Sequence, residues 1–327
     1  MKYRKLGKAN LNVSEIGFGS WQIGGEWGKP DDEESIRAIH LAIEQGVNFI
    51  DTALVYGEGH SERVISRAVA GRREKFVIAS KVPTKTYKWP ALPNQLAKDV
   101  FPADWVIECT EKSLKNLNTD YLDLQQLHAW TPPFLQQTEW LDGFNKLKKQ
   151  GKIKSFGVSS NDWDSYGPTD LIKSGLIDSV QVIYNIFEQR PAEQLLPAAL
   201  ANKVGIIARV PFEEGLLTGK MGPEVKIDPA DWRSNWLTVE RRREAAPRVE
   251  ALKQFLAPDR PTLAALALKF CLSHPAVSAV IPGMRKTTHV KPNCAASDGN
   301  LLPPDIQEKM RAHAFVHGWA YPWANFG

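Results

Sequence analysis

Three consecutive apolar runs of the sequence end in a side chain that can carry charge or a proton: Asp51, Lys81 and His128. Apolar runs of this length predict parallel strands, and neighbouring strands in a sheet lie about 4.8 Å apart. The three side chains can therefore meet at one edge of the sheet. A single polar residue where a strand leaves the core is ordinary, but three on consecutive strands favour a chemical site.

Tyr56 stands five residues after Asp51, in the loop that leaves the first of these strands. Lys81 beside Asp51 would keep its ammonium charged. The unperturbed pKa of a tyrosine phenol is about 10, and a nearby cation favours the phenolate. Such a phenol can protonate a carbonyl oxygen as it becomes an alkoxide, while His128 hydrogen-bonds and orients that oxygen. The four residues predict proton delivery, with neither a nucleophile nor a metal cage. The alternative for Tyr56 is packing on the rim of the loop.

Eight apolar runs alternate with stretches of helical periodicity, and most successive runs are about 25–30 residues apart, the size of one β/α unit. The runs are apolar on both faces, which is typical of parallel strands covered by helices. They are Ile16–Phe18, Val47–Ile50, Phe76–Ala79, Leu122–Leu127, Ile153–Val158, Val180–Tyr184, Val204–Val210 and Ala279–Ile281.

Eight such units predict an α/β fold, a (β/α)8 TIM barrel forming a single domain over residues 1–327. We expect residues 2–13 to form a hairpin at the barrel bottom and long insertions at about 82–102 and 211–260. A C-terminal helix over Pro304–His317 and an aromatic tail should complete residues 304–327. A doubly wound sheet is the alternative, but Gly17-Phe18-Gly19 lacks the third glycine of a dinucleotide fingerprint.

The composition of the chain limits the classes of binding partner that we expect. The 327 residues carry a net charge of +4 without long runs of one sign, and this gives no case for nucleic acid or membrane as a partner. No apolar run reaches about 18 residues, and no secretion signal is recognisable at the start. Three cysteines without a Cys-x-x-Cys pair do not make a disulfide framework or a zinc site. We expect a cytoplasmic protein acting on a small molecule, and a homo-oligomer is compatible with the sequence.

The residues around these positions carry a resemblance to the aldo-keto reductase family over nearly the whole chain. DTALVYGEGHSE at 51–62 matches the family signature at every fixed position. Further matches follow in order: SK at 80–81, TDYLDL at 119–124 with QLH at 126–128, GVS at 157–159, GLLTGK at 215–220 and IPG at 281–283. Any one of these would be weak evidence, but the ordered set is specific.

The resemblance implies hydride transfer between a nicotinamide dinucleotide and a small aldehyde, ketone or sugar-like carbonyl, or the corresponding alcohol. Tyr56 then matches the general acid/base, Lys81 and Asp51 its electrostatic support, and His128 the group that orients the carbonyl. The cofactor would lie extended across the barrel mouth. By resemblance its contacts map onto Gly19, Ser20, Trp21, Asp51, Ser159, Ser160, Asn161, Gln181, Arg209, Pro211, Phe212, Gly215, Leu216, Lys220, Gly283, Met284, Arg285, His289 and Asn293.

The segment 283–293 resembles the site for the adenosine 2′-phosphate, to which Arg285, Lys286 and His289 would supply donors. NADP(H) is therefore the expected cofactor, with NAD(H) as the alternative. A solvated basic start of a helix would explain the same residues without a ligand.

The chain departs from the family at two positions. Ser160 stands where family members usually carry asparagine, and Asn161 follows one place late. Arg209 replaces the aromatic residue that normally stacks on the nicotinamide. An arginine can stack through its guanidinium plane or pair with a phosphate or an anionic substrate, and the sequence leaves these alternatives open. The role of the insertion at 221–260 is open as well.

Eleven tryptophans are unusual for this length. Aromatic walls suit a flat apolar ligand or the apolar face of a sugar. The expected substrate-contacting residues are Trp21, Trp27, Tyr56, Trp89, His128 and Trp130. Core packing or a subunit contact would explain any one tryptophan equally well. Trp319, Tyr321, Trp323 and Phe326 crowd the C-terminus, where a lid or simple docking on the barrel fits. His313 and His317 have metal-compatible spacing, but surface positions are expected for both.

Two other functions deserve weight. A lyase could form a Schiff base on Lys81, although pairing with Asp51 opposes this, since a charged lysine is no nucleophile. A slow-turnover NADP-binding regulatory subunit, resembling potassium-channel β subunits, is the other alternative.

Overall fold

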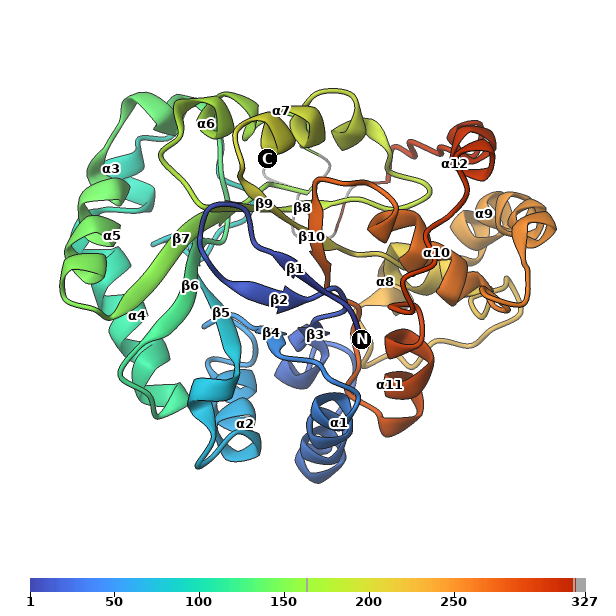
Figure 1. Cartoon of the computed structure of the whole chain (residues 1–327), viewed down its shortest axis with the longest axis horizontal. Helices are drawn as coiled ribbons and strands as arrows, with labels where there is room; N and C mark the ends of the chain where they lie inside the picture. The colour runs from blue at the N-terminus through green and yellow to red at the C-terminus, as the bar shows by residue number, and fades with distance from the viewer. Residues whose placement is uncertain (163, 320, 322–327) are drawn as a thin grey trace.

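Eight parallel strands form one curled sheet in the computed structural model, which describes residues 1–162, 164–319 and 321 (Figure 1). The strands neighbour one another in chain order: β3 Phe18–Gly19, β4 Phe49–Asp51, β5 Val77–Val82, β6 Leu122–Leu127, β7 Ile153–Ser159, β8 Ser179–Ile183, β9 Gly205–Arg209 and β10 Val277–Val280. Parallel bridges join Ile16 to Val280 and Gly19 to Gly283, so the first strand meets the last. The predicted (β/α)8 barrel is confirmed.

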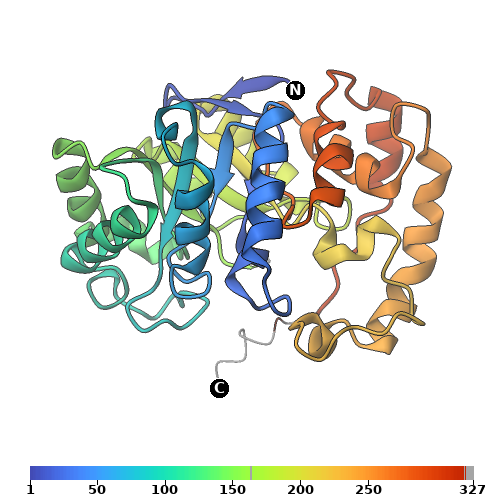
Figure 2. The ribbon, with the colours of Figure 1, turned by 90° about the horizontal axis from the view of Figure 1, so that it is seen from below.

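The predicted N-terminal hairpin closes the bottom of this barrel. β1 (Tyr3–Lys5) and β2 (Asn12–Ser14) pair antiparallel, with Tyr3 opposite Ser14. Leu6 and Val13 are fully buried in a cluster with residues of the barrel interior such as Phe49. Figure 2 shows the hairpin at the upper edge and the described part of the C-terminal tail running to the opposite edge. The C-terminal ends of the strands are thereby left to build a site.

Helices cover the outside of the sheet. They are α1 Asp32–Glu44, α2 His60–Ala68, α3 Ala97–Val100, α4 Ala103–Leu117, α5 Glu139–Lys149, α6 Thr169–Ser174, α7 Leu195–Ala201, α8 Arg233–Trp236, α9 Val239–Ala251, α10 Leu263–Leu272, α11 Thr287–Cys294 and α12 Pro304–Arg311. The start of α1 follows from its sequence, because the Asp31 carboxylate accepts from the Glu34 N–H at 3.0 Å and acids favour the positive end of the helix dipole. None of the described helices is long and apolar enough to cross a membrane.

The long insertion after β9 holds a 3-10 turn, η5 (Glu213–Thr218), followed by α8 and α9. Asp231, just before α8, forms an antiparallel bridge with Trp27, and the Trp232 N–H donates to the Glu26 carbonyl at 3.0 Å. The insertion is thereby joined to the loop after β3, at the C-terminal face of the barrel. The single-domain organisation of the chain stays a prediction.

The C-terminal helix is shorter than expected. It ends at Arg311, whereas the sequence pattern suggested His317. Residues 312–319 and 321 form no further helix, and Phe315 donates its N–H to the Phe187 carbonyl at 2.9 Å. Trp323 and Phe326, expected to belong to an aromatic tail, lie outside the described residues.

Close packing between β7 and β8 makes Gly157 a sensitive position. A Cβ on Gly157 would lie 2.3 Å from the Ser179 carbonyl oxygen and 2.4 Å from its hydroxyl. We expect Gly157→Ala to lower the free energy of unfolding by about 1–3 kcal/mol, because the strands must separate to accept a methyl group. Urea denaturation measures this change. Gly318→Ala is the control, since the site is open and its effect should stay within about 0.5 kcal/mol. Equal midpoints for the two variants would contradict the packing argument.

Candidate active site

A fully buried ion pair lies at the C-terminal end of β4 and β5. The Lys81 Nζ, with a side chain 0% exposed, donates to Asp51 Oδ1 at 2.5 Å and to the Thr52 carbonyl at 2.8 Å. The register that sets Asp51 opposite Ala79 brings the two side chains together. A buried ammonium requires such a partner, because leaving it unpaired costs several kcal/mol.

Tyr56 and His128 complete a convergent group around this pair. The loop after β4 turns back, with the Tyr56 N–H donating to the Ala53 carbonyl at 3.1 Å. This turn places the Tyr56 hydroxyl 3.4 Å from the Lys81 Nζ. The rings of Tyr56 and His128 meet edge to face with centroids 5.8 Å apart. The structure thus brings together the four residues that the sequence singled out.

Burial controls the protonation of this group. It raises the pKa of Tyr56 well above its usual value, and the Asp51 charge adds to the rise while Arg209 opposes it. The expected gain in acidity of the phenol is therefore outweighed by desolvation. Burial also lowers the pKa of Lys81, against the pull of Asp51. The pKa of His128 falls well below its usual value through burial and the charges of Lys81 and Arg209. At neutral pH Tyr56 holds its proton and His128 is uncharged.

Two glutamines from other strands hold the Asp51 carboxylate. Gln181 Nε2, in the middle of β8, donates to Asp51 Oδ2 at 2.8 Å, and Gln126 Nε2 in β6 lies 3.5 Å from the same oxygen. The resemblance assigned Gln181 to a cofactor carboxamide, but in the structure its amide nitrogen donates to Asp51. No sequence motif signalled this contact, because 130 positions separate the two residues.

A second ion pair, missed by sequence reasoning, lies beside the group. Arg209 Nη2 donates to Asp162 Oδ1 at 2.8 Å and to the Ser160 carbonyl at 3.2 Å. Trp89 Nε1 donates to the other Asp162 oxygen at 2.9 Å, and its ring lies edge-on to His128 with centroids 5.0 Å apart. Arg209 is therefore fixed at the mouth by a carboxylate of this chain. Its Nε is buried without a partner among the described residues.

The residues after β7 divide into two kinds. Asn161 pairs with the backbone of Ala91 in both directions: its Nδ2 donates to the carbonyl at 2.9 Å, and its Oδ1 accepts from the N–H at 3.2 Å. Its amide is thus engaged by the loop after β5. Ser159 and Ser160 are buried, and the Ser160 hydroxyl has no partner within the described part of the chain. A polar ligand group would satisfy it there.

Part of the expected aromatic wall is present. Trp21 packs near Tyr56, with centroids 6.4 Å apart, and Trp27 lies edge-on behind Trp21 at 5.2 Å. Trp232, from the insertion, lies 5.6 Å from Trp21. Trp130 corrects the expectation, because it is fully buried and lies 5.3 Å from the Trp140 ring in the core beneath α5. Its indole is a core contact.

The tail is held on η5 by two buried carboxylates. His317 Nε2 lies 2.8 Å from Glu213 Oε1, and Asn185 Nδ2 donates to the other oxygen at 2.7 Å. Tyr321 donates its hydroxyl to Glu214 Oε1 at 2.9 Å. His317 was expected at the surface; the structure buries it because the tail folds back over the insertion. Burial raises the pKa of Glu214 to about 8.

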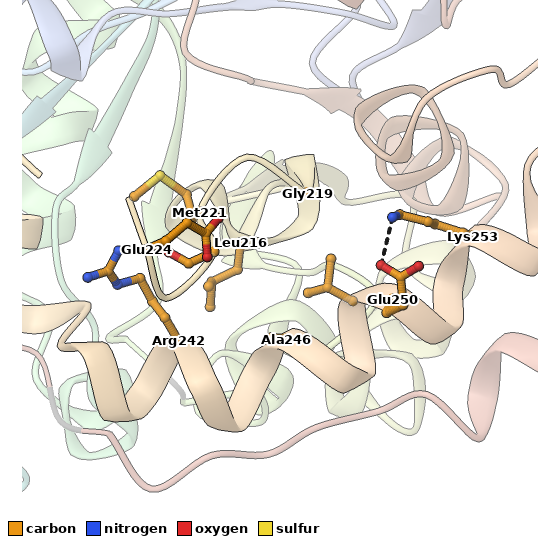
Figure 3. Close-up of a pocket in the computed structure, with 10 residues that line it drawn as sticks. Leu216, Gly219, Met221, Glu224, Arg242, Ala246, Glu250 and Lys253 are labelled. Carbon is orange, nitrogen blue, oxygen red and sulfur yellow. Dashed lines mark hydrogen bonds and ion pairs between the residues drawn. The ribbon is translucent and has the colours of Figure 1, made fainter. Parts of the chain in front are cut away.

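A cavity of about 200 Å³ separates η5 from α9 (Figure 3). Arg242 crosses one end and donates to the Gly222 carbonyl at 2.8 Å, while a Glu250–Lys253 ion pair closes the other at 2.6 Å. Leu216 lines the cavity from the side of η5. Within the insertion α9 therefore packs against η5, and this cavity includes none of Asp51, Tyr56, Lys81 and His128.

Residues after β10 form the other expected cofactor end. Met284 is fully buried, and a Cβ on Gly283 would lie 2.7 Å from the Gln22 side chain. Asn293 is buried, and its Nδ2 has no partner among the described residues. Unpaired buried amides in native proteins call for a ligand or water. Lys220 and His289 lie close enough for the lysine charge to lower the pKa of the imidazole, although burial is the larger cause.

Two orphaned polar atoms lie at opposite ends of the set of residues that the resemblance assigns to the cofactor. A Cβ on Gly19 would lie 2.7 Å from the Ile281 carbonyl oxygen, so the backbone there approaches too closely for a side chain. The Ser160 hydroxyl at one end and the Asn293 amide at the other suit the polar groups of a dinucleotide. The donor set fits such a cofactor.

Comparisons with known proteins agree with this geometry. The model of the Aldo/keto reductase family matches residues 15–313. The aldo-keto reductase YhdN of Bacillus subtilis (strain 168) is 33% identical over 293 residues, 88% of this chain and 86% of that protein. The NADH-specific methylglyoxal reductase of Escherichia coli (strain K12) is 30% identical over 317 residues, 93% and 96% of the two chains. The structure of the aldo-keto reductase AKR11C1 from Bacillus halodurans (holo form) superposes with a TM-score of 0.74 at 28% identity, covering 97% of each chain.

The positive charge of Arg209 should affect the pKa of His128. We expect Arg209→Gln to raise the pKa of His128, because one of the two cations that lower it is removed. Titration of the imidazole carbon-bound protons by NMR measures the change, with His128→Gln assigning the resonance. Arg233→Gln is a matched control, since Arg233 pairs with Asp231 at 2.6 Å in a neighbouring loop. An unchanged or lower pKa of His128 in Arg209→Gln would show that the Arg209 charge does not lower the pKa of this imidazole.

Glu214 should make stability depend on pH. Its pKa is about 8 in the fold against 4.5 for the ordinary group, so the folded state loses relative stability as the pH rises from 4.5 to 8 and no further above. Glu214→Gln removes this loss. We therefore compare the unfolding free energy of Glu214→Gln with that of the parent at two pH values. The difference between variant and parent should be larger at about pH 8 than at about pH 5, by roughly 2–4 kcal/mol. Urea denaturation at both pH values tests this, with the exposed Glu244→Gln as control; a pH-independent difference counts against it.

Proposed function

This chain belongs to the aldo/keto reductase family, an oxidoreductase family, and from that premise we propose its reaction. The chain transfers a hydride between a nicotinamide dinucleotide and a small aldehyde, ketone or sugar-like carbonyl, or the corresponding alcohol. The observation that carries the proposal is the convergence of Asp51, Tyr56, Lys81 and His128, in which a phenol, an ammonium and an imidazole face one another at the barrel mouth.

Tyr56 is the proton donor in the direction of reduction. Its raised pKa keeps the phenol protonated at neutral pH, as an acid requires. When the proton passes to the carbonyl oxygen, the Lys81 ammonium at 3.4 Å stabilises the phenolate that remains. In the direction of oxidation the same phenolate accepts the proton of the alcohol. Asp51 fixes the ammonium through its 2.5 Å contact.

His128 orients the carbonyl. The uncharged imidazole can donate one ring N–H to the carbonyl oxygen, which leaves the transfer of a full proton to Tyr56. Trp89 packs against its ring, and the Asp162 carboxylate holds Trp89 in place. The imidazole therefore has a fixed position relative to the phenol.

The cofactor would lie along the path from Ser160 to Asn293. When bound, the nicotinamide supplies or accepts the hydride. Gly19, Ser159 and Ser160 border the catalytic end, and the segment 283–293 the adenosine end. η5 and the residues around it, including Pro211, Phe212, Gly215 and Leu216, would cover the middle. The basic residues of segment 283–293 favour NADP(H), with NAD(H) as the alternative.

The substrate would meet an aromatic wall. Trp21 and Trp89 face Tyr56 and His128 from two sides, and Trp27 supports Trp21 from behind. Such walls suit a flat apolar group or the apolar face of a sugar. The cytoplasmic location and a homo-oligomeric state remain predictions.

The two alternatives have different signatures. A Schiff-base lyase needs a neutral Lys81, and the 2.5 Å contact with Asp51 opposes this. Borohydride trapping of a carbonyl on Lys81 would revive it. Tight dinucleotide retention with negligible turnover and a co-purifying partner would favour the regulatory subunit.

Removal of the phenolic hydroxyl tests the proposal. We expect Tyr56→Phe to lower kcat about 10²–10⁴-fold, because the acid is lost, while dinucleotide binding is unchanged. The loss of reduced-nicotinamide absorbance with a panel of carbonyls measures turnover. Tyr166→Phe is the control, because Tyr166 contacts Glu193 at an exposed site. Full activity in Tyr56→Phe would eliminate the proposed acid.

A further inference from the structure

The first turn of α11 binds a carboxylate that belongs to the chain itself. Glu34 Oε1, from α1, accepts from both the N–H and the hydroxyl of Thr287, each at 2.8 Å. Its other oxygen accepts from Arg37 at 2.9 Å. Helices α1 and α11 lie side by side in both ribbon views (Figures 1 and 2).

The surroundings of this carboxylate are positive. The charges of Lys286, Lys220 and Arg285 all act on His289, whose pKa is lowered first by burial and then by these cations. The contacts with Thr287 lower the pKa of Glu34 to about 2, so its charge persists at any physiological pH. A helix N–H, a hydroxyl and several cations are the donors that a phosphate monoester takes. In this chain a carboxylate already accepts from two of them.

Arg285 is also engaged. Its guanidinium donates to the carbonyls of Trp27, Gln22 and Gly28, at 2.7, 3.2 and 3.3 Å respectively. Arg285 therefore holds the loop after β3, whereas the resemblance assigned it to the 2′-phosphate of the cofactor. Lys220 and Lys286 remain as exposed basic groups near the start of α11, and His289 lies within range of their charges.

A second observation places a ligand along α11. Asn293 lies on the same helix, is 5% exposed, and carries an amide nitrogen without a partner in the described chain. An orphaned buried amide is costly unless something else accepts from it. The helix thus has one donor pair occupied by Glu34 and one donor unoccupied farther along.

We infer that Glu34 is a specificity-determining residue, which disfavours a dinucleotide carrying a 2′-phosphate relative to one carrying a 2′-hydroxyl. The inference rests on the proposed function, since it assumes that the adenosine end lies at α11. A 2′-phosphate would bring up to two negative charges to donors that Glu34 holds, and the two anions repel. A hydroxyl at that position brings no charge. The basic residues alone predict NADP(H), whereas Glu34 works against it.

Glu34→Gln tests the inference with little change in shape. The glutamine retains an oxygen that can accept from Thr287, loses the charge, and releases Arg37 from its ion pair. We expect the variant to bind NADPH about tenfold more tightly than the parent and NADH with unchanged affinity. Quenching of tryptophan fluorescence gives both dissociation constants without turnover.

The neighbouring Glu33 provides the matched control. Glu33 pairs with Arg67 at 2.5 Å on the exposed side of α1, so Glu33→Gln removes the same charge one position away. We expect its NADPH-to-NADH affinity ratio to equal that of the parent. An unchanged ratio in Glu34→Gln, or an equal shift in both variants, would overturn the inference, the second because net charge alone would then explain it. Failure of the parent to bind either dinucleotide would overturn the proposed function and this inference together.

Discussion

The buried Lys81–Asp51 ion pair is the constraint on which the rest of the site depends. An ammonium with no exposed surface is stable only where hydrogen-bond acceptors surround it, and Asp51 and the Thr52 carbonyl provide them. Asp51 must in turn be held, and Gln181 reaches it from β8. Four strands, β4, β5, β6 and β8, therefore each contribute a side chain to one charged centre. The loop that carries Tyr56 lies next to this centre.

Other charged side chains at the barrel mouth are also paired with a hydrogen-bonding partner. Arg209 is neutralised by Asp162, and Glu213 contacts Asn185 and His317. Each charge meets its partner through a segment from another part of the fold. The C-terminal tail is thus bound to η5 by polar contacts as well as by aromatic packing, such as the stacking of Tyr321 on Trp236 at 4.8 Å.

The two ends of the mouth use different chemistry. At the end near Asp51, the strands and the loop after β4 fix the positions of Lys81, Tyr56 and His128, and burial shifts the pKa of each of these three groups. At the end near α11, Glu34 accepts from Thr287, and backbone carbonyls of the loop after β3 hold Arg285. On the proposed function, the barrel sets the reaction type and the elements around it set the selectivity, where substitutions disturb the core less.

The sequence by itself determined the barrel and the convergence of polar groups at the ends of its strands. Apolar runs of regular spacing specify parallel strands, and groups at the ends of neighbouring strands must converge, so Asp51, Lys81 and His128 were predictable. The start of α1 was predictable too, because the Asp31 cap is local. Tertiary structure alone decided which polar groups pair across the fold. Glu34 meets Thr287 over 253 positions, and His317 meets Glu213 over 104. The spacing of residues along the chain does not identify such partners. Several acidic side chains could accept from the same donor, and only the packing of the fold decides which one lies within hydrogen-bond distance.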